Sequence, residues 1–336
     1  MRHLRCFSST ARAISTLLVV SAAIAAAPVA AQDQKIIRIM VARSISAVPM
    51  LAIGPFAEKH GLKTEILPFA TNGEMQNGLR SGSAQLGQLG LQSPAILADQ
   101  GATDVKVIFG YATGAHNLIV RKAAGIKSWK DLEGKTIGRA PGTFTGVLLT
   151  LAAQDNNVDL SKVKLVNTTA VGTAELQALK SGDLDGLAMY SPIIDRAVVE
   201  GYAEYPSCCD ILSTKKFGRG NQIYAATTSF LADRATVVRL LKAYLESEEF
   251  YLKNPEKALE VTGQFTGVPR PVLVEASKHF AWDHRVDLQA AVNVAKEGPA
   301  FGFTKTDTSA KVPSLFDLSF LAEATGKPIE QLDSLR

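Results

Sequence analysis

Two stretches about a hundred residues apart repeat one pattern: "LRSGSAQLGQLGLQSP" at 79–94 and "LKSGDLDGLAMYSP" at 179–192. Each begins with Leu, a basic residue and Ser-Gly, passes through a short apolar run, and ends at Ser-Pro. Glycine commonly ends helices, short apolar runs are typical of buried strands, and Ser-Pro is favoured where a helix begins. The pattern therefore predicts a helix, a turn, a buried strand and a new helix, once in each of two units.

The flanking sequence continues the same alternation in both units. Apolar runs predict strands at 35–42, 63–69, 84–90 and 105–112, and again at 135–140, 163–169 and 185–190. Helical spacing lies between them at 49–60, 74–81, from Ser93, at 142–158, at 173–180 and from Ser191. After Asp233, a favourable N-cap, the chain is mainly helical. We therefore predict an α/β fold with two lobes, each a mainly parallel sheet flanked by helices.

The N-terminus has the layout of a secretory signal peptide. Three arginines precede an apolar run at 13–27, and Val29 and Ala31 stand where a signal peptidase requires small residues. A membrane anchor is the alternative, but the run is short and rich in alanine. We expect cleavage after about Ala31 and export of the rest of the chain to the periplasm.

Composition limits the classes of function. The formal net charge of +4 includes the three signal arginines, so the remaining chain is nearly neutral, which argues against nucleic acid or an anionic membrane as partner. No nucleophile elbow, zinc-protease helix or phosphate loop is present, and the histidines lack metal-ligand spacing. We expect no catalysis, metal or cofactor. Cys208 and Cys209 are adjacent, and either free thiols or a vicinal disulfide would fit them.

The two repeated stretches, together with "SWKDLEGKTIG" at 128–138, resemble the periplasmic binding proteins of ABC importers for nitrate, sulfonates and taurine. The resemblance covers nearly the whole exported chain. It implies two lobes that close on one small molecule by bending at 116–122 and 221–230, and an inner-membrane ABC permease as partner. We assign 32–121 and 223–336 to the first lobe and 122–222 to the second, and we expect a monomer.

Other functions are compatible with the same resemblance. The superfamily includes binding proteins for pyrimidine precursors of thiamine, and an aromatic acid would also fit such a protein. An enzyme that resembles the pyrimidine synthases is a further alternative, although "PSCCDI" lacks their fuller cysteine cluster. A ligand-sensing partner of a membrane receptor would share every feature above.

Ligands of open α/β sheets bind beyond the carboxyl ends of the strands, where helix starts offer unpaired N–H groups that suit an anion. The candidate ligand-binding residues are therefore Arg43, Ser44, Ser46, Gln92 and Ser93 in the first lobe, His116 at a crossover, and Arg139, Gly142, Thr143, Phe144, Thr145, Gly172, Thr173, Tyr190 and Ser191 in the second. The alternatives are ordinary helix capping for the serines, threonines and glycines, a solvated position for each arginine, a structural role in the hinge for His116, and core or rim packing for Phe144 and Tyr190. We predict a sulfonate or carboxylate held mainly by Ser93, Thr143 and Ser191, with Arg43 or Arg139 adding charge.

Overall fold

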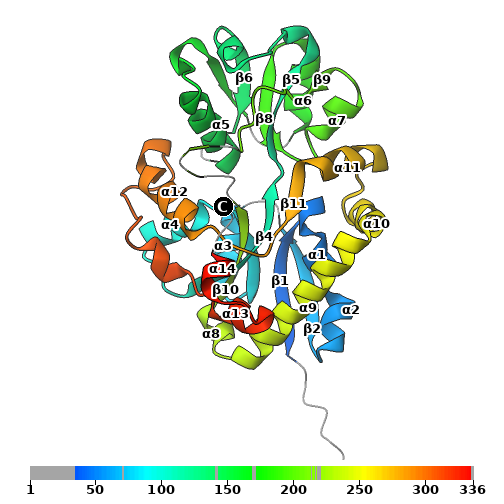
Figure 1. Cartoon of the computed structure of the whole chain (residues 1–336), viewed down its shortest axis with the longest axis vertical. Coiled ribbons are helices and arrows are strands. Elements are labelled where there is room, and N and C mark those ends of the chain that lie inside the picture. Colours follow the sequence, from blue (N-terminus) through cyan, green and yellow to red (C-terminus); the bar gives the residue numbers. More distant parts are fainter. Residues whose placement is uncertain are drawn as a thin grey trace, which may run out of the picture. The chain divides into compact units, whose positions relative to one another are not determined.

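Two separate β-sheets organise the chain (Figure 1). The computed structural model describes residues 35–69, 72–140, 143–168, 172–212, 214–215, 217 and 221–333. The expected signal peptide and the candidate Gly142 lie outside these ranges. The predicted α/β class is confirmed, because each sheet is flanked by helices.

The first sheet has the strand order β11-β4-β10-β3-β1-β2. Its strands are β1 (Ile36–Ala42), β2 (Lys63–Phe69), β3 (Leu86–Leu89), β4 (Val105–Gly114), β10 (Asn221–Thr227) and β11 (Phe280–Trp282). The connecting helices are η1 (Ile45–Ala47), α1 (Val48–Leu51), α2 (Gly54–Lys59), α3 (Asn72–Arg80) and α4 (Ser93–Asp99). The helix expected at 49–60 is thus divided in two, since Gly54-Pro55 begins a new helix there.

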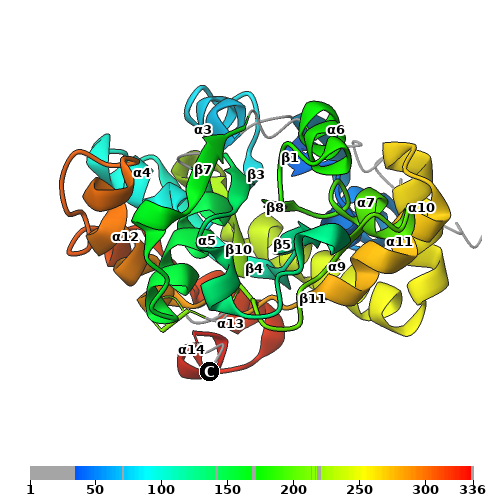
Figure 2. The ribbon, with the colours of Figure 1, turned by 90° about the horizontal axis from the view of Figure 1, so that it is seen from above.

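The second sheet has the order β7-β6-β8-β5-β9. Its strands are β5 (His116–Arg121), β6 (Thr136–Arg139), β7 (Lys164–Asn167), β8 (Gly186–Tyr190) and β9 (Ala203–Glu204). The helices are α5 (Phe144–Asp155), α6 (Thr173–Ser181) and α7 (Asp195–Val199), with short 3-10 turns η2 (Lys122–Ala124), η3 (Trp129–Leu132) and η4 (Leu160–Lys162). Figures 1 and 2 show α5 on one face of this sheet and α6 and α7 on the other.

Both sheets are mixed, although we expected them to be mainly parallel. In the first sheet β1 is parallel to β2 and β3, whereas β10 runs antiparallel to both β3 and β4. In the second sheet β6 is parallel to β7 and β8, whereas β5 runs antiparallel to β8 and β9. Strands β5 and β10 directly follow the two connections between the sheets, where no crossover helix intervenes to restore the direction, and β11, which follows η5, also runs antiparallel to β4.

The C-terminal third is helical, as expected. It contains α8 (Thr228–Leu231), α9 (Arg234–Lys253), α10 (Pro255–Thr266), α11 (Arg270–Ala276), η5 (Ser277–His279), α12 (Leu288–Phe301), η6 (Val312–Leu315), α13 (Ser319–Thr325) and α14 (Ile329–Leu332). Asp233 caps α9 as predicted, accepting the Thr236 N–H at 3.2 Å. Helix α9 packs on α2 and α13, α12 packs on α4, and α11 reaches α7 beside the second sheet.

The repeated sequence pattern builds the same hydrogen-bonded corner twice. In the first copy, Gln85 N–H donates to Arg38 O, and Arg38 N–H donates back to Gln85 Oε1, both at 2.9 Å. In the second, Asp185 N–H donates to Thr136 O at 2.8 Å, and Thr136 N–H donates to Asp185 Oδ2 at 3.0 Å. Each copy thereby fixes the start of a strand, β3 or β8, against the central parallel strand of its sheet.

The two copies differ after the strand. Ser93 is the first residue of α4, preceded by Gln92 as N-cap without a side-chain hydrogen bond, so the expected capping role of Ser93 is wrong. The Ser191-Pro192 peptide is cis, and α7 begins only at Asp195, so the helix expected from Ser191 is also wrong.

Candidate functional site

The strand order of each sheet reverses at one point, and ligands of open α/β sheets bind at such points. In the first sheet the reversal lies at the carboxyl ends of β1 and β3. Arg43 follows β1 directly, and Gln92 and Ser93 follow β3. In the second sheet the reversal lies at the ends of β6 and β8, which are followed by Thr143 and Ser191. The candidates from sequence therefore gather at both reversal points.

At the first reversal point, Ser93 is the most enclosed candidate. It is fully buried, and its N–H donates to Gly90 O at 2.9 Å. Its hydroxyl and the Gln92 side-chain oxygen are buried without a hydrogen-bond partner among the described residues. Beside them, Gln88 on β3 accepts the Ala42 N–H at 2.6 Å and so joins the ends of β3 and β1. Ser93 and Gln92 are thus positioned by strand ends, while the Ser93 hydroxyl and the Gln92 side-chain oxygen remain available to a ligand.

The three candidates after β1 have contacts of their own. The Arg43 guanidinium is exposed and lies 5.7 Å from the centre of the Phe265 ring on α10. Ser44 and Ser46 share a hydroxyl hydrogen bond of 3.0 Å. The Ser46 carbonyl accepts the Trp282 indole N–H at 2.8 Å. These contacts hold the loop after β1 against α10 and β11.

At the second reversal point, Thr143 is the N-cap of α5. Its hydroxyl accepts the Gly146 N–H at 3.2 Å and donates to Ala140 O at 2.7 Å, which satisfies its usual hydrogen-bonding capacity. Arg139, at the end of β6, donates to the Thr150 hydroxyl on α5 at 3.2 Å. The Nε atom of Arg139 is buried without a partner among the described residues.

A chain of hydrogen bonds connects the two sheets through His116. The Tyr111 hydroxyl on β4 donates to Gln222 Oε1 on β10, and the Gln222 amide lies 3.2 Å from His116 Nε2. His116 Nδ1 lies 2.6 Å from the Thr145 hydroxyl at the start of α5. Because the Gln222 amide donates, Nε2 accepts and the imidazole proton belongs on Nδ1, facing Thr145. We name Tyr111, Gln222, His116 and Thr145 the bridging chain.

The environment of His116 keeps it neutral. Desolvation lowers the pKa of His116 from 6.5 to about 4, because a charged imidazole loses its hydration there. The Phe144 ring lies perpendicular to the imidazole, with 5.5 Å between the two ring centroids, and forms part of the apolar surroundings of His116. His116 also faces Tyr190 in the register of β5 and β8. The structure therefore brings together four candidates: His116, Phe144, Thr145 and Tyr190.

Sequence reasoning missed three polar residues of this region. Tyr111 lies in β4, Gln222 in β10 and Gln88 in β3, where Gln88 is 2% exposed and is the one polar side chain of its strand. A single glutamine inside a buried strand signals a required hydrogen bond, since an unpaired amide there would be costly. That signal was available for Gln88, whereas Gln222 follows Asn221 at the start of its strand and does not stand out.

Gly172 and Thr173 lie on the other face of the second sheet, at the start of α6. Gly172 has φ +101°, and its N–H donates to Glu175 Oε2 at 2.9 Å. A side chain at Gly172 would place its first carbon 2.3 Å from the Ile193 side chain. Burial, and then the negative charge of Glu175, raise the pKa of Tyr190. This part of the site is therefore sterically tight and carries a buried carboxyl.

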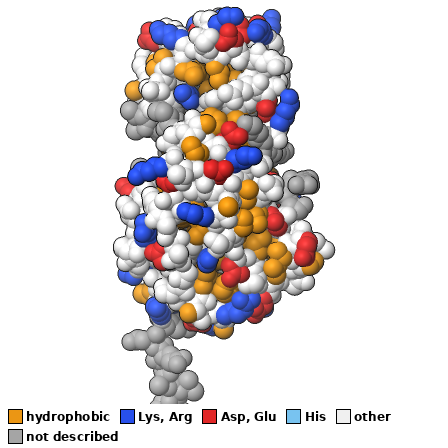
Figure 3. Space-filling view, turned by 90° about the vertical axis from the view of Figure 1, so that its left-hand side faces the viewer, with side chains coloured by type: hydrophobic (Ala, Val, Ile, Leu, Met, Phe, Trp, Pro, Cys, Tyr) orange, Lys and Arg blue, Asp and Glu red, His pale blue; other side chains and the backbone are white. Residues whose placement is uncertain are grey.

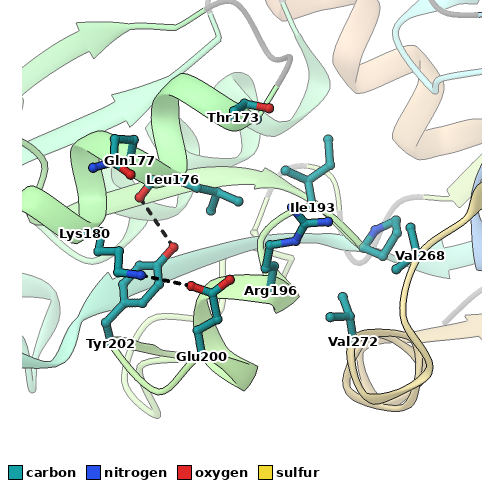
Figure 4. Close-up of a pocket in the computed structure, with 12 residues that line it drawn as sticks. Thr173, Leu176, Gln177, Lys180, Ile193, Arg196, Glu200, Tyr202, Val268 and Val272 are labelled. Atoms are coloured by element: carbon teal, nitrogen blue, oxygen red, sulfur yellow. Dashed lines mark hydrogen bonds and ion pairs between the residues drawn. The ribbon is translucent and has the colours of Figure 1, made fainter.

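A cavity of about 300 Å³ adjoins the α6 start (Figure 4). It is lined by Gly172, Thr173, Leu176, Gln177, Lys180, Pro192, Ile193, Arg196, Glu200, Tyr202, Val268 and Val272. Figure 4 shows Val268 and Val272 across from the residues of α6 and α7, and Lys180 paired with Glu200 at 3.3 Å. Of the candidates, only Gly172 and Thr173 line this cavity, and the bridging chain contributes none of its residues.

Ser191 lies at a contact between α7 and the C-terminal region. Its N–H donates to Ala115 O at 2.9 Å. Nearby, the Tyr205 hydroxyl donates to Asp195 at 2.6 Å, and the Tyr205 ring stacks on His279 at 3.7 Å between centroids. Burial raises the pKa of Asp195, which Tyr205 and Ser191 partly oppose. Ser191 thus faces an enclosed acidic side chain.

Among the described residues, no helix is both long and apolar enough to cross a bilayer. The same residues contain no group of three or more His, Cys, Asp or Glu side chains arranged to hold a metal ion. On the face shown in Figure 3, positive and negative side chains are interspersed, without a field of one sign.

Comparisons with known proteins agree with this architecture. A protein of Brucella abortus (strain 2308), named provisionally as a binding protein, is 27% identical over 226 residues, covering 66% of this chain and 68% of its own. The taurine-binding periplasmic protein of Escherichia coli is 24% identical over 275 residues, covering 77% of this chain and 83% of its own.

The solved structures place the fold. The periplasmic aliphatic sulphonate-binding protein of Escherichia coli superposes with a TM-score of 0.68 at 18% identity, covering 82% of this chain and 91% of that one. The chain therefore has the fold of the periplasmic binding proteins. The model of the family described as NMT1/THI5 like matches residues 54–258, which is more than half of the sequence. This protein belongs to the NMT1/THI5-like family.

Proposed function

We propose that this protein is the periplasmic substrate-binding component of an ABC importer, and that it captures a small organic anion, a sulfonate or a carboxylate. Its relatives include binding proteins, one of them for taurine, and a protein of the same fold binds aliphatic sulphonates. The observation that carries the proposal is the gathering of polar candidates at both reversal points, with the bridging chain between the two sheets.

The proposed ligand contacts come mainly from neutral groups. Ser93 and Gln92 offer buried polar atoms without a partner among the described residues, and Tyr190 is partly exposed at the end of β8. The Nε atom of Arg139, at the end of β6, is likewise buried without a partner among the described residues. It would supply a charge-assisted contact to the ligand. Arg43 is a weaker choice because its guanidinium lies on Phe265. Thr143 would act through its backbone and as the cap of α5.

We propose a division into lobes that follows the sheets. Lobe 1 would comprise 32–115 and 221–336, and lobe 2 would comprise 116–220. The first connection is Ala115, whose φ of +63° is uncommon for a residue other than glycine, and the second is the segment between β9 and β10. Bending at these two places would close the lobes on the ligand. This moves the expected hinges from 116–122 to Ala115 and from 221–230 to the segment before β10, because β5 pairs within the second sheet and β10 pairs within the first.

We further propose that residues 1–31 are removed on export and that the protein acts as a monomer without catalytic activity. Intact mass of periplasmic material tests the processing: a chain beginning at 32 is expected, and a full-length species in the membrane fraction would contradict it. Partnership with a membrane permease follows from the role of importer components.

A thermal-shift screen of the chain 32–336 tests the function. Taurine, alkanesulfonates, small carboxylates, nitrate and the hydroxymethylpyrimidine precursor of thiamine form the panel. A ligand at a hundredfold excess over its dissociation constant should add about 2.7 kcal/mol to the free energy of unfolding. Stabilisation by a sulfonate or carboxylate supports the proposal. Stabilisation by the neutral pyrimidine alone would replace it with the pyrimidine-binding alternative.

A further inference from the structure

Cys208 and Cys209 are joined by a disulfide in the segment that returns the chain from β9 to β10. We propose that this disulfide is a redox modification site, and that its reduction by a dithiol loosens both connections between the two sheets. The proposal concerns a part of the molecule away from the reversal points and does not depend on the ligand.

The disulfide borders a second cavity, of about 430 Å³. The first connection contributes Thr113, Gly114, Asn117 and Leu118, the return segment contributes Tyr205, Pro206, Cys209, Asp210 and Leu212, and the region of β11 contributes Lys278, His279, Phe280 and Ala281. Both connections between the sheets therefore meet at one cavity, with Cys209 in its wall. We expect a change at the cysteines to alter the first connection as well, because both line this cavity.

The two cysteines differ in exposure. Cys209 is 2% exposed and belongs to the same apolar cluster as Ile211, Phe217 and Leu148 of α5. Cys208 is partly exposed. We therefore expect a thiolate from outside to attack Cys208, the more exposed residue, and Cys209 to be the leaving group. The adjoining cavity provides space into which the Cys209 thiol can turn once it is released.

The chemistry is ordinary thiol–disulfide exchange. One thiolate of the dithiol attacks Sγ of Cys208, the Cys208–Cys209 bond breaks, and Cys209 leaves as a thiolate that takes up a proton. The second thiolate of the dithiol then attacks the reagent sulfur that is bonded to Cys208. This closes the disulfide of the reagent and releases Cys208 as a thiolate that takes up a proton. The protein gains two electrons and two protons, and the dithiol becomes a disulfide.

We expect reduction to loosen only the residues close to Cys208 and Cys209, because hydrogen bonds hold the chain on both sides of the two cysteines. Before it, Tyr205 is held by its hydrogen bond to Asp195 at 2.6 Å. After it, the Lys215 N–H donates to Asp155 of α5 at 2.7 Å. A disulfide between neighbouring residues closes a small ring around their shared peptide bond, and reduction removes that restraint while the anchors remain. The effect is expected in the return segment and in the facing residues of the first connection.

Hydrogen exchange of the full exported chain, without any ligand, tests the proposal. Oxidised protein is compared with protein reduced by dithiothreitol. Exchange in peptides covering 205–212 and 112–118 should rise about tenfold on reduction and return on reoxidation. Strands β1 and β2 contribute no residue to the wall of the second cavity. They serve as an internal control, and their hydrogen exchange should not change on reduction. The variant carrying Cys208→Ser and Cys209→Ser should match the reduced protein and ignore dithiothreitol.

Two results would overturn the proposal. One is equal exchange at 205–212 in oxidised and reduced wild-type protein. The other is an alkylated intact mass that shows two free thiols in protein purified without reductant. If the serine variant fails to fold, the reversible response of the wild-type protein decides by itself. Failure of sulfonate binding would leave the exchange result unaffected, so the two proposals fail separately.

Discussion

His116 makes the stability of this protein dependent on pH in a way that can be calculated. Its pKa is lowered from 6.5 to about 4 by desolvation in the folded chain, so the native state keeps the imidazole neutral where the unfolded chain already binds a proton. Because the unfolded state binds more protons between these values, the free energy of unfolding falls as the pH falls through this window. Above pH 6.5 this penalty is absent.

The perturbation is His116→Asn, compared with wild type in urea unfolding from about pH 7.5 to about pH 5. Over that interval the wild type should lose about 2 kcal/mol more than the variant, since only the wild type carries this titration. The variant starts lower, because it gives up the hydrogen bonds to Thr145 and Gln222. The difference in slope, and not the starting stability, is the quantity of interest.

The variant His60→Asn is the matched control. His60 bonds to Glu246 at 2.8 Å, between α2 and α9, and takes no part in the bridging chain. It should retain the pH dependence contributed by His116. Equal losses of stability in wild type and His116→Asn would refute the account of a desolvated, neutral imidazole.

Two further substitutions test how the second sheet is held. Gly172→Ala should lower the free energy of unfolding by about 1–3 kcal/mol in thermal unfolding, because Gly172 has a positive φ and a Cβ atom there would lie 2.3 Å from the Ile193 side chain. Gly54→Ala is the control: a Cβ atom at Gly54 would have no neighbour within 4 Å, so this variant should be nearly neutral in the same assay. Asp185→Leu should cost about 1.5–3 kcal/mol, because the carboxylate binds both Arg121 and the Thr136 N–H. Gln85→Leu, at the matching position of the first copy, should lower the free energy of unfolding by only about 1 kcal/mol, because the Gln85 amide is uncharged. Equal losses for Gln85→Leu and Asp185→Leu would contradict the charge-assisted role of Asp185.

Much of the fold followed from local sequence patterns. Strand β2 occupies the expected residues 63–69, because its apolar run is bounded by Gly61 and by the polar stretch after Phe69. The repeated pattern predicted α3-β3 and α6-β8 because helix-ending glycines and short apolar runs act locally. Its reciprocal hydrogen bonds to β1 and β6 were not expected, since they join residues about 47 and 49 positions apart.

The site was less accessible to sequence reasoning. Helix starts could be located from their residue types, but which hydroxyls serve as caps depends on backbone geometry: Thr143 caps α5, while Ser93 lies inside α4. The bridging chain needs Tyr111 and Gln222 from strands that pair only in three dimensions. A cis peptide at Ser191-Pro192 cannot be read from residue order, because X-Pro bonds adopt both isomers.

Calorimetric titration of the chain 32–336 tests the central claim most directly, using the anion that stabilises it most in the thermal screen. Ser93→Ala removes a candidate contact at the first reversal point, and Tyr190→Phe removes one at the second. Each lost hydrogen bond to a charged ligand costs about 1.5–3 kcal/mol, so both variants should bind about ten- to a hundredfold more weakly with the fold retained. Undiminished affinity in both variants, or a tightest ligand that carries neither a sulfonate nor a carboxylate group, would contradict an anionic group held between the two sheets.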